Sequence, residues 1–534
     1  MSRLSPTILT TVLFLGSAAG GQVFAQQTID FDNATVLQLQ AAMDAGTLTS
    51  EKLVQLGLAR IDAYDDKGPK LNAVLTLNPR ALETARALDA ERKAKGKRGP
   101  LHGIPVVLKD NFDTADLPTT GGSILLDGSV PPDDAFVVKK LREAGAVVLA
   151  KVNLSEFASG GAFSSLGGQT RNPHDPARTP SGSSGGTGVA VAAGYAPLGL
   201  GTDTGGSVRG PSTSNGIVGL KPTHGLLSRD GIIPLALSFD TGGPMARNVA
   251  DVAVALGVMT GVDPADEATK KSDGRFERDY TKYLNANALK GARIGVARDF
   301  MGQDAEVDWV VEASLQALRA AGATVVDIRF PKWLLDAKGE FYTAVRYPEF
   351  PGQVGAYLAT LKPGFPRTLA EMIEKSDRIA AMRADGAGPN PPRWTLFKRE
   401  ASSGPIDSYR YTAVRDHGLP LVRATMEGVI SSANLDAYVY PTASRRPAFI
   451  SAPPDTPGGD GASGSNLANL SGFPDLIVPA GFTSDRLPVA ISFVGPAFSE
   501  AKLIGFGYAF EQATKARRRP AHTPGLSGES VVVK

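Results

Sequence analysis

Residues 131–150 have the sequence PPDDAFVVKKLREAGAVVLA, which predicts a helix followed directly by a strand. The prolines and aspartates stand at the start, where they favour helix initiation. Phe136, Val137 and Leu141 recur at helical spacing, and Gly145 supplies the positive φ that commonly ends a helix. Residues 146–150 are continuously apolar, as expected of a strand that is buried on both faces of a sheet.

The same order of helix, glycine and strand recurs at residues 307–322 and 324–328. Residues 104–108 and 293–297 add two more apolar strands. Helices that alternate with buried strands predict an α/β protein with a largely buried, mixed sheet. We find no fixed-period repeat and no linker, so residues 26–534 are interpreted as one domain.

One long stretch, residues 330–460, lacks clear periodicity and carries proline clusters together with Trp333 and Trp394. Two interpretations remain open for it. It is either an insertion that shapes the rim of a pocket or a plain excursion over the surface.

Charge and composition exclude several classes of function. The 534 residues carry 56 Lys and Arg against 54 Asp and Glu, with five His and no Cys. The net charge of +2 predicts no nucleic-acid partner and favours small-molecule partners. Without Cys there is no disulfide, no zinc thiolate site, no iron–sulfur cluster and no thiol nucleophile. The histidines do not pair in a metal-ligand spacing such as H-E-x-x-H, so no metal is expected.

The N-terminus has the three parts of a secretory signal peptide. Arg3 precedes an apolar stretch from Ile8 to Ala19, and Val23-Phe24-Ala25 offers a small-residue cleavage site. A membrane anchor is the alternative, but a spanning helix needs about 20 apolar residues and this stretch has roughly half of them. We therefore expect residues 1–25 to be removed on export to the periplasm or out of the cell, which leaves no stable membrane anchor.

Glycine, serine and threonine dominate residues 159–225. Within them, residues 181–186 (SGSSGG) and 201–209 (GTDTGGSVR) are typical of tight turns in which backbone N–H groups converge on one point. Such turns can hold an oxyanion or a phosphate. Neither continues as G-K-[ST] or forms G-x-G-x-x-G, which argues against phosphate binding. For either segment alone, a flexible turn is an equal alternative.

Lys109 ends the apolar strand in residues 101–111, LHGIPVVLKDN. A lysine at the end of a buried strand loses hydration, which favours its neutral amine, and a neutral amine can act as a base toward a serine hydroxyl. The alternatives are that Lys109 reaches solvent or forms an ion pair with Asp110.

A competing motif is present in residues 182–186, GSSGG, which match the nucleophile pattern G-x-S-x-G of α/β-hydrolases. This hypothesis makes Ser184 the nucleophile of an esterase and requires His224, His417 or His522 as its base. In α/β-hydrolases the tight turn that carries this pattern directly follows a hydrophobic strand. Here the residues before the motif, 178–180, are Arg-Thr-Pro. The esterase therefore remains the weaker alternative.

In combination, these motifs resemble the amidase signature family, whose members hydrolyse the carbon–nitrogen bond of linear amides with a Ser-Ser-Lys triad. The resemblance covers about residues 30–520 and rests on motifs that occur in one order: residues 103–111, 182–186, 199–223, 231–234, 240–247 and 472–489. It implies an α/β fold in which a single large α/β/α domain surrounds a mixed, twisted sheet.

Matched to the family's motifs, Ser207 corresponds to the nucleophile, Lys109 to the general base, and Ser183 to the bridging serine that members hold in a cis peptide. The resemblance also assigns an oxyanion hole to the backbone N–H groups of Thr204, Gly205, Gly206 and Ser207. Three further residues are expected to support the loop, namely Thr202, Asp203 and Arg209.

The resemblance implies an enzyme without cofactor that acts on a small-molecule amide or an amidated peptide. The expected signal peptide makes the chain more similar to bacterial peptide amidases than to amidotransferase subunits, which work in the cytoplasm with partner chains. An acyl group could contact Phe163, Trp333, Phe341 and Tyr342, although these residues could equally belong to the core. An exported binding protein on an amidase scaffold is a further alternative, and the sequence does not indicate an oligomeric state.

Overall fold

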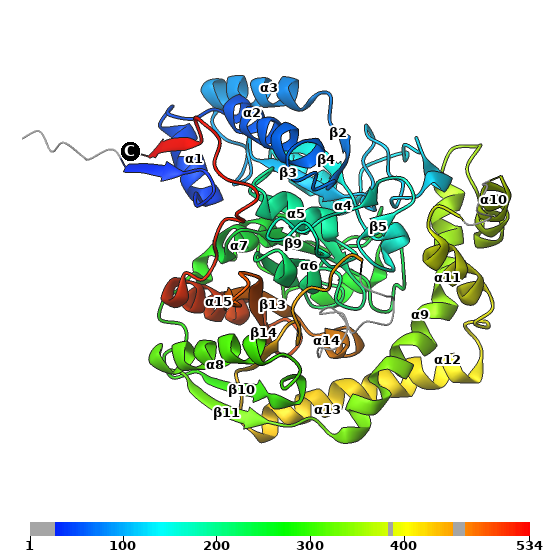
Figure 1. Cartoon of the computed structure of the whole chain (residues 1–534). Helices are drawn as coiled ribbons and strands as arrows, with labels where there is room; N and C mark the ends of the chain where they lie inside the picture. The colour runs from blue at the N-terminus through cyan, green and yellow to red at the C-terminus, as the bar shows by residue number, and fades with distance from the viewer. Residues whose placement is uncertain (1–26, 383–387, 452–464, 534) are drawn as a thin grey trace, which may run out of the picture.

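A mixed, twisted sheet runs through the middle of the molecule in the computed structural model, which describes residues 27–382, 388–451 and 465–533. The sheet has eleven strands among these residues, in the order β11-β10-β12-β14-β13-β8-β9-β7-β3-β4-β2 (Figure 1). Its strands are β2 (Val74–Leu77), β3 (Pro105–Lys109), β4 (Val147–Val152), β7 (Leu198–Asp203), β8 (Val218–Lys221), β9 (Thr241–Ala246), β10 (Arg293–Ala297), β11 (Thr324–Ile328), β12 (Ala437–Pro441), β13 (Asp475–Phe482) and β14 (Pro488–Val494).

Parallel and antiparallel pairs occupy different parts of the sheet. Strands β7, β3 and β4 are parallel to one another, as are β11, β10 and β12. The strands between these two groups pair antiparallel. The prediction of a mixed sheet is therefore confirmed. Two small pairs lie outside it, β1 (Gln27–Asp30) with β15 (Ser530–Val533) and β5 (Phe163–Ser164) with β6 (Gly168–Gln169).

Helices cover both faces of the sheet (Figure 1). They are α1 (Val36–Asp44), α2 (Ser50–Ile61), α3 (Ala81–Lys95), α4 (Phe136–Glu143), α5 (Gly185–Ala192), α6 (Arg209–Ser214), α7 (Val249–Met259), α8 (Ala305–Ala320), α9 (Lys332–Thr360), α10 (Leu369–Ala381), α11 (Pro391–Ala401), α12 (Tyr409–Ala413), α13 (Leu419–Ser432), α14 (Ser465–Ser471) and α15 (Glu500–Thr514). Two of these helices, α4 and α8, lead into β4 and β11 as the sequence predicts. Val137 and Leu141 of α4 are fully buried, whereas Phe136 is only partly buried.

Strand β3 shows how the sheet separates two hydrophobic cores. Val106 and Leu108 pack in the core that includes α1, α4, α7, α8 and α15. Val107 packs in the other core, with α3 and α5. Side chains alternate along a strand, so Lys109, two residues after Val107, faces the side of the sheet where α5 begins.

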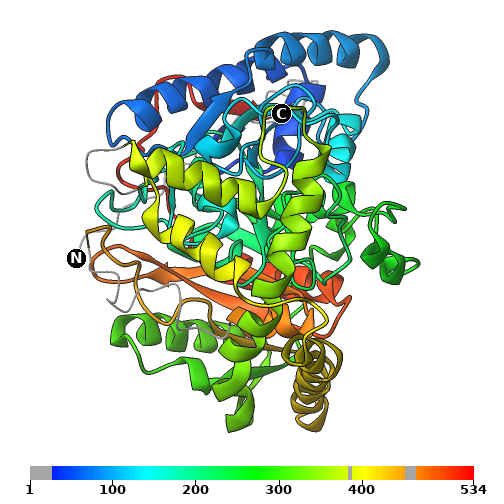
Figure 2. The same cartoon turned by 90° about the vertical axis from the view of Figure 1, so that its right-hand side faces the viewer.

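Residues 332–432, which we call the helical insertion, form helices α9 to α13 (Figure 2). In Figure 2 its yellow-green and yellow helices face the viewer. The sequence shows no helical period here because α9 contains Pro348 and Pro351 and several of its faces contact different partners. Trp394 is buried in this insertion, whereas Trp333 is 39% exposed.

The expected signal peptide, residues 1–25, lies outside the described residues. Within the described ranges, none of the helices has both the length and the apolar character required to cross a bilayer.

Candidate active site

Two parallel strands bring the first site residues together. Strands β3 and β7 pair in parallel, so their carboxyl ends, at Lys109 and Asp203, lie at the same edge of the sheet. Lys109 Nζ lies 2.7 Å from Ser183 Oγ and 2.6 Å from Thr202 Oγ1. The lysine side chain is fully buried.

Burial decides the protonation of Lys109. It lowers the pKa of the amine to about 7, although the negative charges of Asp203 and Asp240 oppose the shift. Asp110 does not pair with Lys109, because its carboxylate forms a buried ion pair with Lys151 at 3.0 Å. The structure therefore excludes both alternatives to a buried amine, solvent exposure and pairing with Asp110.

The two glycine-rich turns lie against each other. Ser184 N–H donates to the carbonyl oxygen of Ser207 at 3.2 Å, which places Ser207 beside the turn that carries Ser183. The peptide bond between Gly182 and Ser183 is cis. Ser207 is half-buried, and its hydroxyl makes no hydrogen bond with any described residue. A reagent from solvent can therefore reach this hydroxyl.

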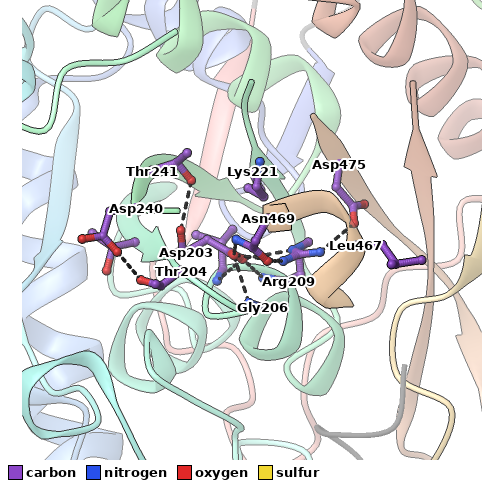
Figure 3. A network of polar contacts seen from close by, with 12 residues as sticks. Asp203, Thr204, Gly206, Arg209, Lys221, Asp240, Thr241, Leu467, Asn469 and Asp475 are labelled. Carbon is purple, nitrogen blue, oxygen red and sulfur yellow. Dashed lines mark hydrogen bonds and ion pairs between the residues drawn. The ribbon is translucent and has the colours of Figure 1, made fainter. Parts of the chain in front are cut away.

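Asp203 organises the second turn (Figure 3). Its carboxylate accepts hydrogen bonds from the backbone N–H groups of Gly206 and Val208, both at 2.9 Å, and from Nε and Nη2 of Arg209, both at 3.0 Å. Burial opposes ionisation, but the Arg209 guanidinium and these donors hold the pKa of Asp203 well below its usual range. The turn is thus fixed by one ionised carboxylate.

Arg209 extends this network to the C-terminal part of the chain (Figure 3). Its guanidinium contacts Asn469 of α14 and donates to Asp475 of β13 at 3.1 Å. Asn469 also donates to Asp203 at 2.9 Å. All of these side chains are buried. The loop-support residues expected from the sequence, Thr202, Asp203 and Arg209, therefore all contact the site or its turn.

The four residues expected to form an oxyanion hole differ in their amide contacts. The Gly206 N–H donates to Asp203, and Gly206 has a φ of +130°, which requires glycine. The N–H groups of Thr204 and Ser207 donate to no acceptor among the described residues. Thr204 is held by its hydroxyl, which donates to Asp240 at 2.5 Å.

The hydroxyl of the alternative nucleophile, Ser184, is hydrogen-bonded to the backbone. Its Oγ lies 3.2 Å from both the N–H and the carbonyl oxygen of Thr202, and the side chain is fully buried. Of the three candidate bases, His224 contacts Leu237, Arg229 and Lys271. In the described ranges no histidine hydrogen bond reaches a serine. This geometry does not support a histidine-dependent esterase.

Of the four aromatic residues considered for the pocket, Tyr342 of α9 approaches the second turn. A Cβ atom at Gly205 would lie only 2.8 Å from Tyr342 Oη. The ring stacks on Phe239 with centroids 5.4 Å apart. Phe341, like Tyr342, is partly buried against the hydrophobic cluster beneath the insertion, and Phe163 lies in the small strand β5.

Several contributors to the site could not be assigned from spacing in the sequence. Asn111, Asp240, Asn469 and Asp475 lie in or near motifs that carry the family resemblance, but the sequence does not show which side chains they contact. Among the described residues no group of three or more His, Asp or Glu side chains is arranged to hold a metal ion.

Comparisons with known proteins agree with this site. A family model described as Amidase matches residues 52–504. A probable amidase of Arabidopsis thaliana is 35% identical over 529 residues, 96% of each chain. A glutamyl-tRNA(Gln) amidotransferase subunit of Halorhodospira halophila is 38% identical, over 90% of this chain and 97% of its own.

Among solved structures, native peptide amidase from Stenotrophomonas maltophilia is 40% identical, with a TM-score of 0.85 over 92% of this chain and 99% of its own. The resemblance inferred from the sequence is therefore confirmed in sequence and in fold. The chain belongs to the amidase family and is an enzyme that hydrolyses amide bonds.

Proposed function

We propose that the protein hydrolyses a linear amide through an acyl-enzyme on Ser207, with Ser183 as the proton relay and Lys109 as the base. One observation carries the proposal. A fully buried amine lies 2.7 Å from the Ser183 hydroxyl, in a turn whose next residue is hydrogen-bonded to Ser207. Burial keeps this amine neutral for much of the time near pH 7.

In the acylation step, Ser207 Oγ attacks the amide carbonyl carbon. Its proton passes to Ser183 Oγ, and the Ser183 proton passes to Lys109 Nζ. The carbonyl oxygen becomes negative and is stabilised by backbone N–H groups of the turn. The amides of Thr204 and Ser207 are the proposed donors, because they donate to no acceptor among the described residues, whereas the Gly206 amide donates to Asp203.

The tetrahedral intermediate then collapses. The carbon–nitrogen bond breaks as the leaving nitrogen takes a proton back through Ser183 from Lys109. A water molecule attacks the ester on Ser207 and gives its proton to the same relay. The acid leaves, and Ser207 recovers its proton.

The proposed substrate is a small amide or a C-terminally amidated peptide. The similarity to peptide amidase supports this choice, as does the half-buried position of Ser207, which a chain end can reach from solvent. A role in amide transfer is the second candidate, since relatives named as amidotransferase subunits match over most of the chain.

We also propose export. The charged, apolar and small-residue parts of residues 1–25 support it.

Three alanine variants test the proposed chemistry. Ser207→Ala and Lys109→Ala are expected to lower kcat/KM at least about a thousandfold on primary amides and amidated peptides, because each removes a group that acts in the transition state. Ser183→Ala should also be strongly impaired. Lys332→Ala, at an exposed lysine, is the matched control and should retain activity. Wild-type turnover by both Ser207→Ala and Lys109→Ala would defeat the proposal, and loss in Ser184→Ala with full activity in Ser207→Ala would favour the esterase.

The pH dependence gives a second test. Only neutral Lys109 can accept a proton, so kcat/KM is expected to rise with pH through about 7 and then to level off. The charged groups that act on this amine are Asp203, which is paired with Arg209, and Asp240, which is bonded to Thr204. If kcat/KM instead rose to its plateau below pH 5, the base would be a carboxylate, which would contradict the assignment.

A further inference from the structure

Asn111 lies two residues after Lys109 and has no part in the chemistry described above. Its side chain is 1% exposed. Nδ2 donates to Thr202 Oγ1 at 3.0 Å, and the same oxygen lies 2.6 Å from Lys109 Nζ. Asn111 therefore contacts the base through a single hydroxyl.

The direction of hydrogen bonds around Nζ determines whether Lys109 can act as a base. A neutral amine has two N–H bonds and one lone pair. If the Thr202 hydroxyl donates to Nζ, that lone pair is taken and Lys109 can only donate to Ser183. If Lys109 instead donates to Thr202 Oγ1, its lone pair is left to accept the Ser183 proton. The distances between heavy atoms are the same in both arrangements, but only in the second can Lys109 accept a proton from Ser183.

The surroundings of Thr202 favour the second arrangement. Because an amide nitrogen only donates, Asn111 Nδ2 fills one acceptor position of Thr202 Oγ1. The remaining question is where the Thr202 proton points. Asn111 Oδ1, on the same amide group as the Nδ2 that contacts Thr202, is buried and makes no hydrogen bond with any described residue, so it is an acceptor without a donor near this hydroxyl.

Both Asn111 and Thr202 line a small cavity. It measures about 10 Å³, and its lining includes Asn111, Thr202, Thr204 and Asp240. This volume is on the scale of one water molecule, and a water there would have several polar partners. Such a molecule can accept the Thr202 proton and donate to Asn111 Oδ1, which closes a ring of three hydrogen bonds.

We infer that Asn111 is a positioning residue for the base: with Thr202 and one water in this cavity, it fixes the hydrogen bonds around Lys109 Nζ so that the lone pair faces Ser183. The inference rests on the proposed function, because it requires Lys109 to be the base. It goes beyond the triad by assigning a task to a residue whose side chain, among the described residues, hydrogen-bonds to Thr202 and not to Ser207.

Kinetics of substituted enzymes test this assignment. Asn111→Leu, which is similar in size and makes no hydrogen bond, is expected to lower kcat about 10- to 100-fold while KM stays within about twofold, since only the proton transfer is affected. Thr202→Val should have a similar effect, and Thr202→Ser should recover most of the loss. The double variant should be no slower than the slower single variant, because both changes break one ring.

The pH profile separates this role from a merely structural one. Asn111→Asp keeps the side-chain shape but places a carboxylate near Nζ, which favours the charged amine, so the acid limb should move upward by about one pH unit or more. Effects of Asn111→Leu and Thr202→Val that multiply in the double variant, or an acid limb unmoved in Asn111→Asp, would overturn the inference. Thermal unfolding of each variant identifies any that fails to fold, and the near-isosteric Asn111→Asp then decides.

Failure of the inference can be distinguished from failure of the proposed function. If Ser207→Ala and Lys109→Ala are inactive but the Asn111 variants keep wild-type kcat and pH profile, only the inference is wrong. If Lys109→Ala itself remains active, the proposed function is wrong as well.

Discussion

The catalytic turns and the helical insertion are both anchored by buried arginines, but the two anchors differ in composition and in what they hold. In the turns, Arg209 lies between the carboxylates of Asp203 and Asp475. In the insertion, Glu400 lies between the guanidinium groups of Arg346 and Arg393. The first cluster joins parts of the central core. The second joins the insertion to a loop of that core.

One loop at which the two regions meet is residues 155–160. Arg393 Nε donates to the carbonyl oxygen of Glu156 at 3.0 Å, and Arg346 donates to Ser159 at 2.9 Å. Next to them, Ser155 N–H donates to the carbonyl oxygen of Ser183 at 3.0 Å. The insertion therefore influences the relay serine through one short segment of backbone.

The Glu156 carboxylate strengthens the same connection. It accepts hydrogen bonds from Ser123 at 2.6 Å, from Asn390 at 2.8 Å and from Trp394 Nε1 at 3.0 Å. Two of these donors, Asn390 and Trp394, belong to the insertion. The comparison teaches that the core supplies the ion pairs that fix the catalytic turns, whereas the insertion contacts the turns and their supports from outside, through residues 155–160, through Tyr342 and through α14.

The largest effect is expected from the core cluster. Arg209→Met leaves Asp203 and Asp475 buried without their cation, which typically costs about 3–5 kcal/mol, and it removes the group that holds the catalytic turn. Chemical denaturation should show a large loss in the free energy of unfolding together with loss of activity. A loss below about 1 kcal/mol would mean that this cluster does not anchor the core.

A smaller and more local effect is expected from the insertion. Arg393→Met should cost about 1–3 kcal/mol, because Glu400 keeps its pair with Arg346. Hydrogen exchange should become faster in α10, α11 and residues 155–160, and kcat should fall severalfold. Arg378→Ala, at an exposed ion pair with Glu374, is the control and should change neither. Faster exchange spread evenly over the molecule would contradict the proposed division into two regions.

The smallest effect concerns the second contact between the regions. Tyr342→Ala opens space above Gly205, so KM for bulky and small amides should change by different factors, by a few-fold. Tyr342→Phe keeps the ring stacked on Phe239 and should behave much like the wild type. Equal changes in KM for all amides after Tyr342→Ala would mean that the ring does not contact the substrate.

The sequence predicted the parts of this molecule that depend on local pattern. Helical spacing and apolar runs located α4, β4, α8 and β11, and ordered motifs located Lys109, Ser183 and Ser207. The structure brings these three residues into one site, while their roles in catalysis stay predictions that the variants above test.

The contacts between distant segments could not be predicted. Arg209 binds Asp475, which lies 266 residues further along the chain, and Asp203 binds Asn469. Sequence spacing carries no information about such pairs. Lys151 rather than Lys109 binds Asp110, because β3 and β4 are neighbours in the sheet. Helix α9 could not be predicted from the sequence because it contains Pro348 and Pro351, and a proline cannot donate a backbone hydrogen bond within a helix.

The order of the central sheet has a consequence for the protein in concentrated solution. Its two outer strands, β11 and β2, have five and four residues, and β11 carries the exposed Asp327, paired with Arg298 at 3.0 Å. Short edge strands are poor templates for a strand from another molecule, and an exposed charge such as Asp327 makes the β11 edge poorer still. The broad sheet that builds the active site is thereby protected against edge-to-edge aggregation.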